Sequence, residues 1–97
     1  MKLRFTPRAT ADLINIADYI AEQSPQGARR VRDSILESLD IATRFPRIGH
    51  RQSVEGVRKL VTRRYGYIVY YFVDDPADEL VVLTIQHPAR DRPMSDT

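Results

Sequence analysis

Two stretches in the first half of the chain place apolar residues at helical spacing. They are Leu13, Ile16, Ala17 and Ile20 in the first, and Ala28, Val31, Ile35, Leu39 and Ala42 in the second. Thr6-Pro7 and Ser24-Pro25 precede these stretches, and a capping side chain followed by proline is typical of a helix start. The pattern predicts a helix from residue 7 to about 23 and a second from 25 until the apolar pattern fades at Phe45. The short link between them predicts an antiparallel helical hairpin.

Strand-like patterns lie on either side of this hairpin. Residues 2 to 5 alternate polar and apolar, and three further strands are predicted over residues 57–64, 67–73 and 80–87. Their short links favour an antiparallel meander, whereas residues 47–56 resemble an irregular basic loop. The predicted fold class is α+β, with the order strand, helix, helix, strand, strand, strand and the helical hairpin on one face of the sheet.

The stretch from Tyr67 to Val73 contains only β-branched and aromatic residues, so it predicts a central strand buried on both faces. The two helices can cover only one face. We therefore expect the other face to be exposed in an isolated molecule and to receive a partner. In the last strand, Val81, Leu83 and Ile85 are expected to share one face, and His87 has their parity, so it is expected to point toward the helices.

Length and composition limit the classes of protein to consider. The 97 residues predict one domain over 1–97, with about 88–97 as a C-terminal tail. Without a long apolar run or a signal-peptide core, we expect a cytoplasmic protein that has no membrane partner. Because there are no cysteines and only two histidines, we expect no disulfide, no metal site and no cofactor. The acidic cluster at residues 74–79 is interpreted as a solvated turn.

Positive charge is concentrated in the middle of the chain. Between residues 44 and 64, seven basic residues stand against the single acid Glu55, a local net charge of +6. They are Arg44, Arg47, Arg51, Arg58, Lys59, Arg63 and Arg64. The planar fork of arginine suits carboxylates and phosphates, so this segment favours an anionic partner, although a solvated surface is the plainer interpretation.

The order of elements and several short motifs resemble the RelE/ParE superfamily of bacterial toxins, over nearly the whole chain. These motifs are Phe5-Thr6-Pro7-Arg8-Ala9, Phe45-Pro46-Arg47-Ile48-Gly49, Val57-Arg58-Lys59-Leu60, Tyr67-Ile68-Val69-Tyr70-Tyr71 and His87-Pro88-Ala89-Arg90-Asp91. The chain is most similar to the ParE, or plasmid stabilisation, branch. The resemblance implies a growth-inhibiting toxin of a type II toxin–antitoxin system, neutralised by an antitoxin whose C-terminal segment wraps around it. ParE-like proteins poison DNA gyrase rather than perform chemistry.

On this interpretation the residues that bind the target or the partner are Arg58, Lys59, Arg63, Arg64, Tyr70 and Arg90. The alternative that the resemblance implies is a RelE-like, ribosome-dependent mRNA endoribonuclease. RNA cleavage needs a general acid, a general base and cations, which Arg58, Arg63, His87 and Arg90 could supply. A third interpretation is a degenerate toxin retained as a binding module.

Two departures from the RelE pattern favour the non-enzymatic interpretation. RelE-like enzymes use a lysine-rich cluster and commonly an aromatic residue after the last strand. Here Lys59 is the only lysine beyond Lys2, and no tyrosine or phenylalanine follows Phe72. Tyrosines beside arginines could stack on bases, which leaves direct nucleic-acid binding open, but tyrosines in a sheet are more often core or partner surface.

Overall fold

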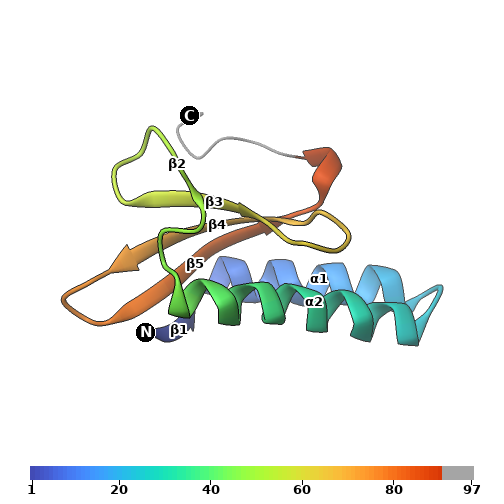
Figure 1. Ribbon diagram of the computed structural model, residues 1–97. Coiled ribbons are helices and arrows are strands. Elements are labelled where there is room, and N and C mark those ends of the chain that lie inside the picture. The colour runs from blue at the N-terminus through green and yellow to red at the C-terminus, as the bar shows by residue number, and fades with distance from the viewer. Residues whose placement is uncertain (91–97) are drawn as a thin grey trace.

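Two helices lie side by side against one face of a five-stranded sheet (Figure 1). The computed structural model describes residues 1–90. Its elements are β1 (Lys2–Phe5), α1 (Pro7–Ala21), α2 (Pro25–Arg44), β2 (His50–Arg51), β3 (Val57–Val61), β4 (Ile68–Asp74), β5 (Glu79–Gln86) and a short 3-10 helix (Pro88–Arg90). The predicted α+β class and element order are confirmed. Within residues 1–90, no helix has the length and apolar character needed to cross a bilayer.

Both helices begin where the sequence predicts. The Thr6 hydroxyl accepts a hydrogen bond from the Ala9 amide at 3.1 Å, and the Ser24 hydroxyl accepts one from the Gly27 amide at 2.9 Å. These bonds satisfy amides that have no partner in the first turn of a helix. A proline follows each cap, so the start of each helix is fixed by local sequence alone.

The strands are arranged in the order β1-β5-β4-β3-β2, with β1 parallel to β5 and every other pair antiparallel. The sheet contains one strand more than predicted, because His50 and Arg51 pair with Lys59 and Arg58. The expected irregular loop is therefore wrong at these two positions; a two-residue strand is too short to show an alternating pattern. The expected tail begins with the 3-10 helix, and Met94 to Thr97 lie outside the described residues.

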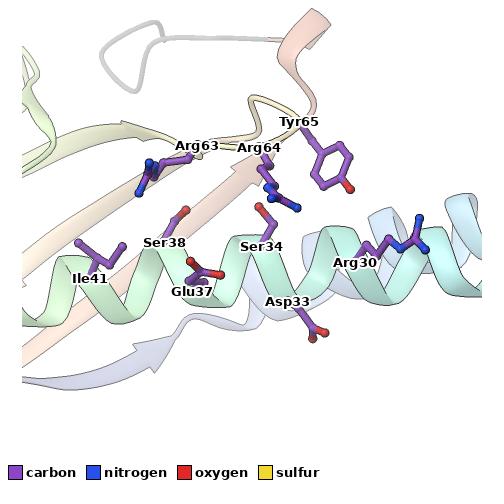
Figure 2. A pocket seen from close by; sticks show the side chains of 9 residues that line it. All are labelled: Arg30, Asp33, Ser34, Glu37, Ser38, Ile41, Arg63, Arg64 and Tyr65. Carbon is purple, nitrogen blue, oxygen red and sulfur yellow. The ribbon is translucent and has the colours of Figure 1, made fainter.

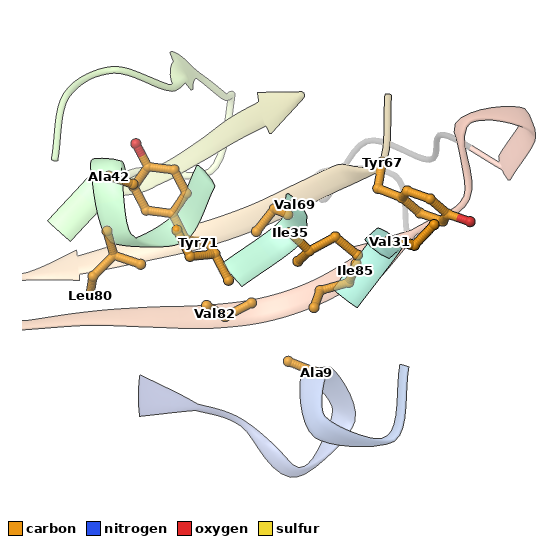
Figure 3. Packing of buried hydrophobic residues seen from close by; sticks show 11 residues of the cluster. Ala9, Val31, Ile35, Ala42, Tyr67, Val69, Tyr71, Leu80, Val82 and Ile85 are labelled. Carbon is orange, nitrogen blue, oxygen red and sulfur yellow. The ribbon is translucent and has the colours of Figure 1, made fainter. Parts of the chain in front are cut away.

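The core lies between the helices and the facing side of β4 and β5 (Figure 3). Its buried members are Ala9, Val31, Ile35, Leu39, Ala42, Tyr67, Val69, Tyr71, Leu80, Val82 and Ile85. Most of these side chains come from α2, β4 and β5. This side of the sheet therefore has the predicted covering of helices.

A β-bulge in β5 breaks the predicted alternation of that strand. Tyr70 pairs with Thr84 and Tyr71 with Val82, so Leu83 is an extra residue in the register. Leu83 packs in a cluster apart from Ile85, and the prediction that these two side chains share a face is wrong. The physical reason is that one inserted residue inverts the in-and-out order of every residue beyond it.

The second face of β4 is also buried to a large extent, contrary to the expected exposure. Ile68 and Tyr70 are 5% and 0% exposed, and they form a small cluster with Val57 and Leu83. Tyr70 stands between Lys59 and Thr84 on the neighbouring strands. Side chains from both flanking strands can bury a central residue without any helix, which the prediction did not consider. Only Phe72, near the end of β4, is exposed on this face of the strand.

Candidate functional site

The predicted site residues are distributed over three separate hollows in the surface. One hollow lies at the turn that connects α2 to β2 and contains Arg58. A second lies between α2 and the β3–β4 hairpin and contains Arg63 and Arg64. The third lies beside α1 at the end of β5 and contains His87. The structure therefore does not bring these residues together in one site.

The first hollow, here named the turn groove, has a volume of about 640 Å³. It is lined by Arg44, Phe45, Pro46, Arg47, Ile48, Gly56, Arg58, Val73 and Asp75. A smaller hollow of about 430 Å³, additional to the three above, adjoins the turn groove and shares Arg47, Gly56 and Arg58 with it. Together they form an elongated surface with more arginines than acids.

Arg58 is one of the residues that line the turn groove. Its Nη1 donates to the Gly49 carbonyl at 2.8 Å and to the Arg47 carbonyl at 3.3 Å. Lys59, the next residue of β3, points to the opposite face of the sheet, because successive side chains of a strand alternate. Arg58 and Lys59 therefore serve different surfaces.

The second hollow, here named the hairpin groove, has a volume of about 620 Å³ (Figure 2). Arg63 and Arg64 project from the hairpin toward α2, where Ser34, Glu37 and Ser38 face them. Among residues 1–90, neither arginine forms an ion pair, so both guanidinium groups can meet an external anion. The five residues of β3 span roughly 16 Å at about 3.3 Å per residue, which separates this groove from Arg58.

Tyr65, at the tip of the same hairpin, has an unusual backbone conformation. Its φ is +66° and that of Gly66 is +65°. Glycine adopts this left-handed conformation without cost, whereas tyrosine is destabilised in it. The tight turn holds a half-exposed aromatic ring beside Arg63 and Arg64.

His87 directly follows β5, on the side of the sheet that faces the helices. Its side chain is exposed. Its Nδ1 accepts a hydrogen bond from the Ala89 amide at 3.1 Å, and its ring meets Tyr67 edge-on at 5.7 Å. Because Nδ1 accepts, the hydrogen of the neutral ring is on Nε2. Nε2 then donates and does not accept, which is unfavourable for a general base.

The other two predicted site residues are Tyr70 and Arg90. Tyr70 is wholly buried and forms no surface contact in the chain as described, and its assignment to partner binding stays a prediction. Arg90 ends the 3-10 helix, but its side chain lies outside what the structure describes.

No group of three or more potential metal ligands occurs within residues 1–90. The acidic turn after β4 is organised by its own contacts. The Asp74 carboxylate accepts from the Ala77 amide at 3.3 Å, and the Asp78 amide donates to the Asp75 carbonyl at 3.1 Å. These short-range bonds explain the turn without a cation.

The most specific polar contacts near the turn groove are those of Tyr71, and the sequence analysis did not predict them. The buried hydroxyl of Tyr71 donates to the Pro46 carbonyl at 2.7 Å and accepts from the Gly49 amide at 3.0 Å. The pKa of Tyr71 is raised above its ordinary 10.0, because the effect of burial is larger than the opposing effects of the Gly49 amide and the Arg58 charge. Burial likewise raises the pKa of Tyr67. The only signal in the sequence was the motif from Phe45 to Gly49, which gave no pointer to Tyr71.

Comparisons with known proteins agree with this architecture. The family model described as "ParE toxin of type II toxin-antitoxin system, parDE" matches residues 3–92. A protein named toxin RelE2, from Caulobacter vibrioides, is 37% identical over 89% of this chain and 93% of its own length. The solved chromosomal ParDE system from P. aeruginosa contains a chain that is 28% identical, with a TM-score of 0.74 over 90% of this chain and 95% of that one.

A chain in the intact E. coli RelBE toxin–antitoxin complex has the same fold, with a TM-score of 0.70 and 22% identity over 94% of this chain and 98% of that one. The fold and the matching family model thus define this chain as a toxin of a type II toxin–antitoxin system. Within that class, the chain belongs to the ParE toxin family.

Proposed function

We propose that this toxin arrests growth by binding DNA gyrase, without chemistry of its own, and that a cognate antitoxin neutralises it by binding. The cations that we propose for these contacts are Arg58, Lys59, Arg63, Arg64 and Arg90. The proposal places the protein in the cytoplasm, where gyrase acts, and needs no cofactor.

The observation that carries the proposal is the separation of the candidate catalytic groups. Arg58, Arg63 and His87 lie in three different hollows. A phosphoryl-cleaving site needs its acid, base and cations within hydrogen-bonding reach of one phosphate. Separate basic grooves suit contacts with a large protein surface better than they suit one reaction centre.

An antitoxin partner is supported by the neighbouring structures, two of which are described as toxin–antitoxin systems or complexes. Arg63 and Arg64, which form no ion pair within residues 1–90, suit acidic side chains. A bidentate arginine–carboxylate contact is among the stronger polar interactions at an interface. Direct binding of nucleic acid by the same cations is a separate possibility that the test below distinguishes.

The test is inhibition of gyrase by the purified toxin. We expect loss of supercoiling and trapping of cleaved DNA, both reversed by adding the cognate antitoxin. The control is the same assay with topoisomerase I, which tests whether the toxin acts only by coating DNA. Unaffected gyrase, or equal inhibition of both enzymes, would contradict the proposal.

The rival function is ribosome-dependent mRNA cleavage, which is favoured by the likeness to toxin RelE2 and by the aromatic Tyr65 beside Arg63 and Arg64. It is tested with the same preparation by primer extension on a transcript translated in vitro. Transcript cutting with gyrase untouched would replace our proposal by this rival. A toxin that produces neither effect and no growth arrest would be a binding module alone.

A further inference from the structure

The turn from Phe45 to Gly49 is held by hydrogen bonds from two side chains of the sheet, one of them fully buried. The Tyr71 hydroxyl bonds to the Pro46 carbonyl and to the Gly49 amide. Arg58 Nη1 bonds to the carbonyls of Arg47 and Gly49. Four hydrogen bonds from two side chains of the sheet thus fix a segment of five residues.

Close packing adds to this restraint at Gly49. A Cβ added there would lie 2.8 Å from Tyr71 Oη and 3.0 Å from the Lys59 carbonyl oxygen. Since one of these neighbours is backbone, a larger residue at position 49 would displace the turn. The turn therefore has one well-defined conformation.

The side chains that this rigid turn displays are apolar and exposed. Phe45 is 62% exposed and Ile48 is 48% exposed, and both line the turn groove. The hydrogen bonds of Tyr71 and Arg58 thus hold a turn that keeps two large apolar side chains in contact with water. A fold gains nothing from this arrangement by itself, whereas a preorganised apolar anchor reduces the entropy cost of binding.

The charge around the turn indicates the chemistry of the occupant. Arg44, Arg47 and Arg58 surround the two apolar side chains, against the single acid Asp75. Arg44 is paired with Asp40 at 3.2 Å, but within residues 1–90 Arg47 forms no ion pair. A second copy of this chain would bring arginine against arginine in a two-fold interface, which is unfavourable. An acidic protein segment is complementary.

We propose that the turn from Phe45 to Gly49 is a preformed docking surface for an acidic segment of the antitoxin that carries a bulky apolar side chain. Phe45 and Ile48 contact the apolar side chain, and Arg47 pairs with a carboxylate. Tyr71 and Arg58 are positioning residues that hold the turn. This inference rests on the proposed antitoxin binding, but it does not depend on gyrase as the target.

The first experiment measures the affinity of the full-length toxin for its purified cognate antitoxin by calorimetry. Phe45→Ala and Ile48→Ala should each raise Kd about tenfold or more, as expected for central apolar anchors. The matched controls are Ile14→Ala and Tyr19→Ala, which are exposed apolar residues of α1, and they should change Kd less than about twofold. Equal effects at both sites, or no effect at the turn, would overturn the proposal.

The second experiment separates positioning from loss of stability. Tyr71→Phe leaves every exposed side chain in place, yet it should raise Kd and accelerate hydrogen exchange at the Gly49 amide. Arg58→Lys keeps the charge but not the fork, so it should weaken binding too, and the double variant should be little worse than either single one. The control is Ile85→Val, a core variant far from the turn. If Ile85→Val raises Kd as much as Tyr71→Phe does for the same loss in the free energy of unfolding, the positioning role of Tyr71 and Arg58 is wrong.

The remaining outcomes identify other occupants. If the Phe45 and Ile48 variants keep their affinity for the antitoxin and lose gyrase inhibition, the surface binds the target and the proposal fails. If free toxin is a dimer that Ile48→Asp dissociates, the occupant is a second copy and the proposal also fails. If the wild type binds antitoxin through this turn but leaves gyrase untouched, the docking surface stands and only the target is wrong.

Discussion

Tyr71 shows how one buried hydroxyl can connect the core to the surface. Its ring is part of the core, and its oxygen satisfies one carbonyl and one amide of the turn. Tyr71→Phe keeps the packing and leaves both backbone groups without a partner. We expect it to lower the free energy of unfolding by about 1–3 kcal/mol, measured by urea denaturation. Tyr19→Phe, at a residue 74% exposed, is the control and should be close to neutral.

The same residue predicts a pH dependence of stability. Because burial raises the pKa of Tyr71 and Tyr67 above 10.0, the folded state binds the phenol proton more tightly than the unfolded state does. The stability that the two protonated phenols contribute is therefore complete below pH 10, and it is lost as the pH rises toward the raised pKa. Urea denaturation between about pH 8 and pH 11 should show stability falling at the alkaline end. The Tyr67→Phe, Tyr71→Phe double variant should fall less; an unchanged slope would contradict the assignment.

At the level of elements, Thr6 does more than cap a helix. Its hydroxyl accepts from the Ala9 amide and also donates to the Leu83 carbonyl at 3.0 Å, beside the β-bulge. Ser24 caps α2 in the same way but has no second contact of this kind within residues 1–90. We expect Ser24→Ala to cost about 1 kcal/mol and Thr6→Ala about twice as much. Equal costs in urea denaturation would show that the bond to β5 adds no stability.

At the β3–β4 hairpin, in contrast to the helix caps, we expect a substitution to raise stability. A turn with positive φ at two successive residues favours Asn-Gly, and here Tyr65 precedes Gly66. Tyr65→Asn should therefore raise the free energy of unfolding by about 1 kcal/mol. If the variant is more stable and less toxic, the strained tyrosine is retained for binding. Unchanged stability would mean that the ring makes compensating contacts in the hairpin groove.

The elements that could be predicted from the sequence are those fixed by local signals. Thr6-Pro7 and Ser24-Pro25 located both helix starts, and the apolar run after Gly66 located the central strand. The bulge at Leu83 could not be predicted, because an extra residue leaves no mark in an apolar strand. The cover over Tyr70 was missed for a related reason. Burial by flanking strands depends on register, which a single sequence does not reveal.

The candidate site was only partly predictable for the same physical reason. The basic segment from Arg44 to Arg64 was evident from composition, but β3 divides it between two grooves. Arg58 could be selected as a cation, whereas its bonds to the Arg47 and Gly49 carbonyls required the folded turn. Contacts between residues distant in sequence are set by topology, and they decide which charges act together.

For the whole molecule, the decisive question is whether its arginines act as one unit or as separate contacts. Members of a catalytic unit are strongly non-additive, since losing one disables the others. Contacts in distant grooves change the binding free energy independently, and their effects add. Arg58 and Arg63 belong to both interpretations and lie in grooves near opposite ends of β3, so they distinguish the two.

We therefore expect Arg58→Ala and Arg63→Ala each to raise the expression level needed for growth arrest several-fold, by roughly 1 kcal/mol of lost binding. In the double variant the two factors should multiply, because the two arginines act in separate grooves. The folded fraction of each variant, measured by circular dichroism, corrects for loss of the turn in Arg58→Ala. A double variant no weaker than the poorer single one would indicate a shared reaction centre and favour the ribonuclease. If both single variants remain fully toxic, neither Arg58 nor Arg63 belongs to the functional site.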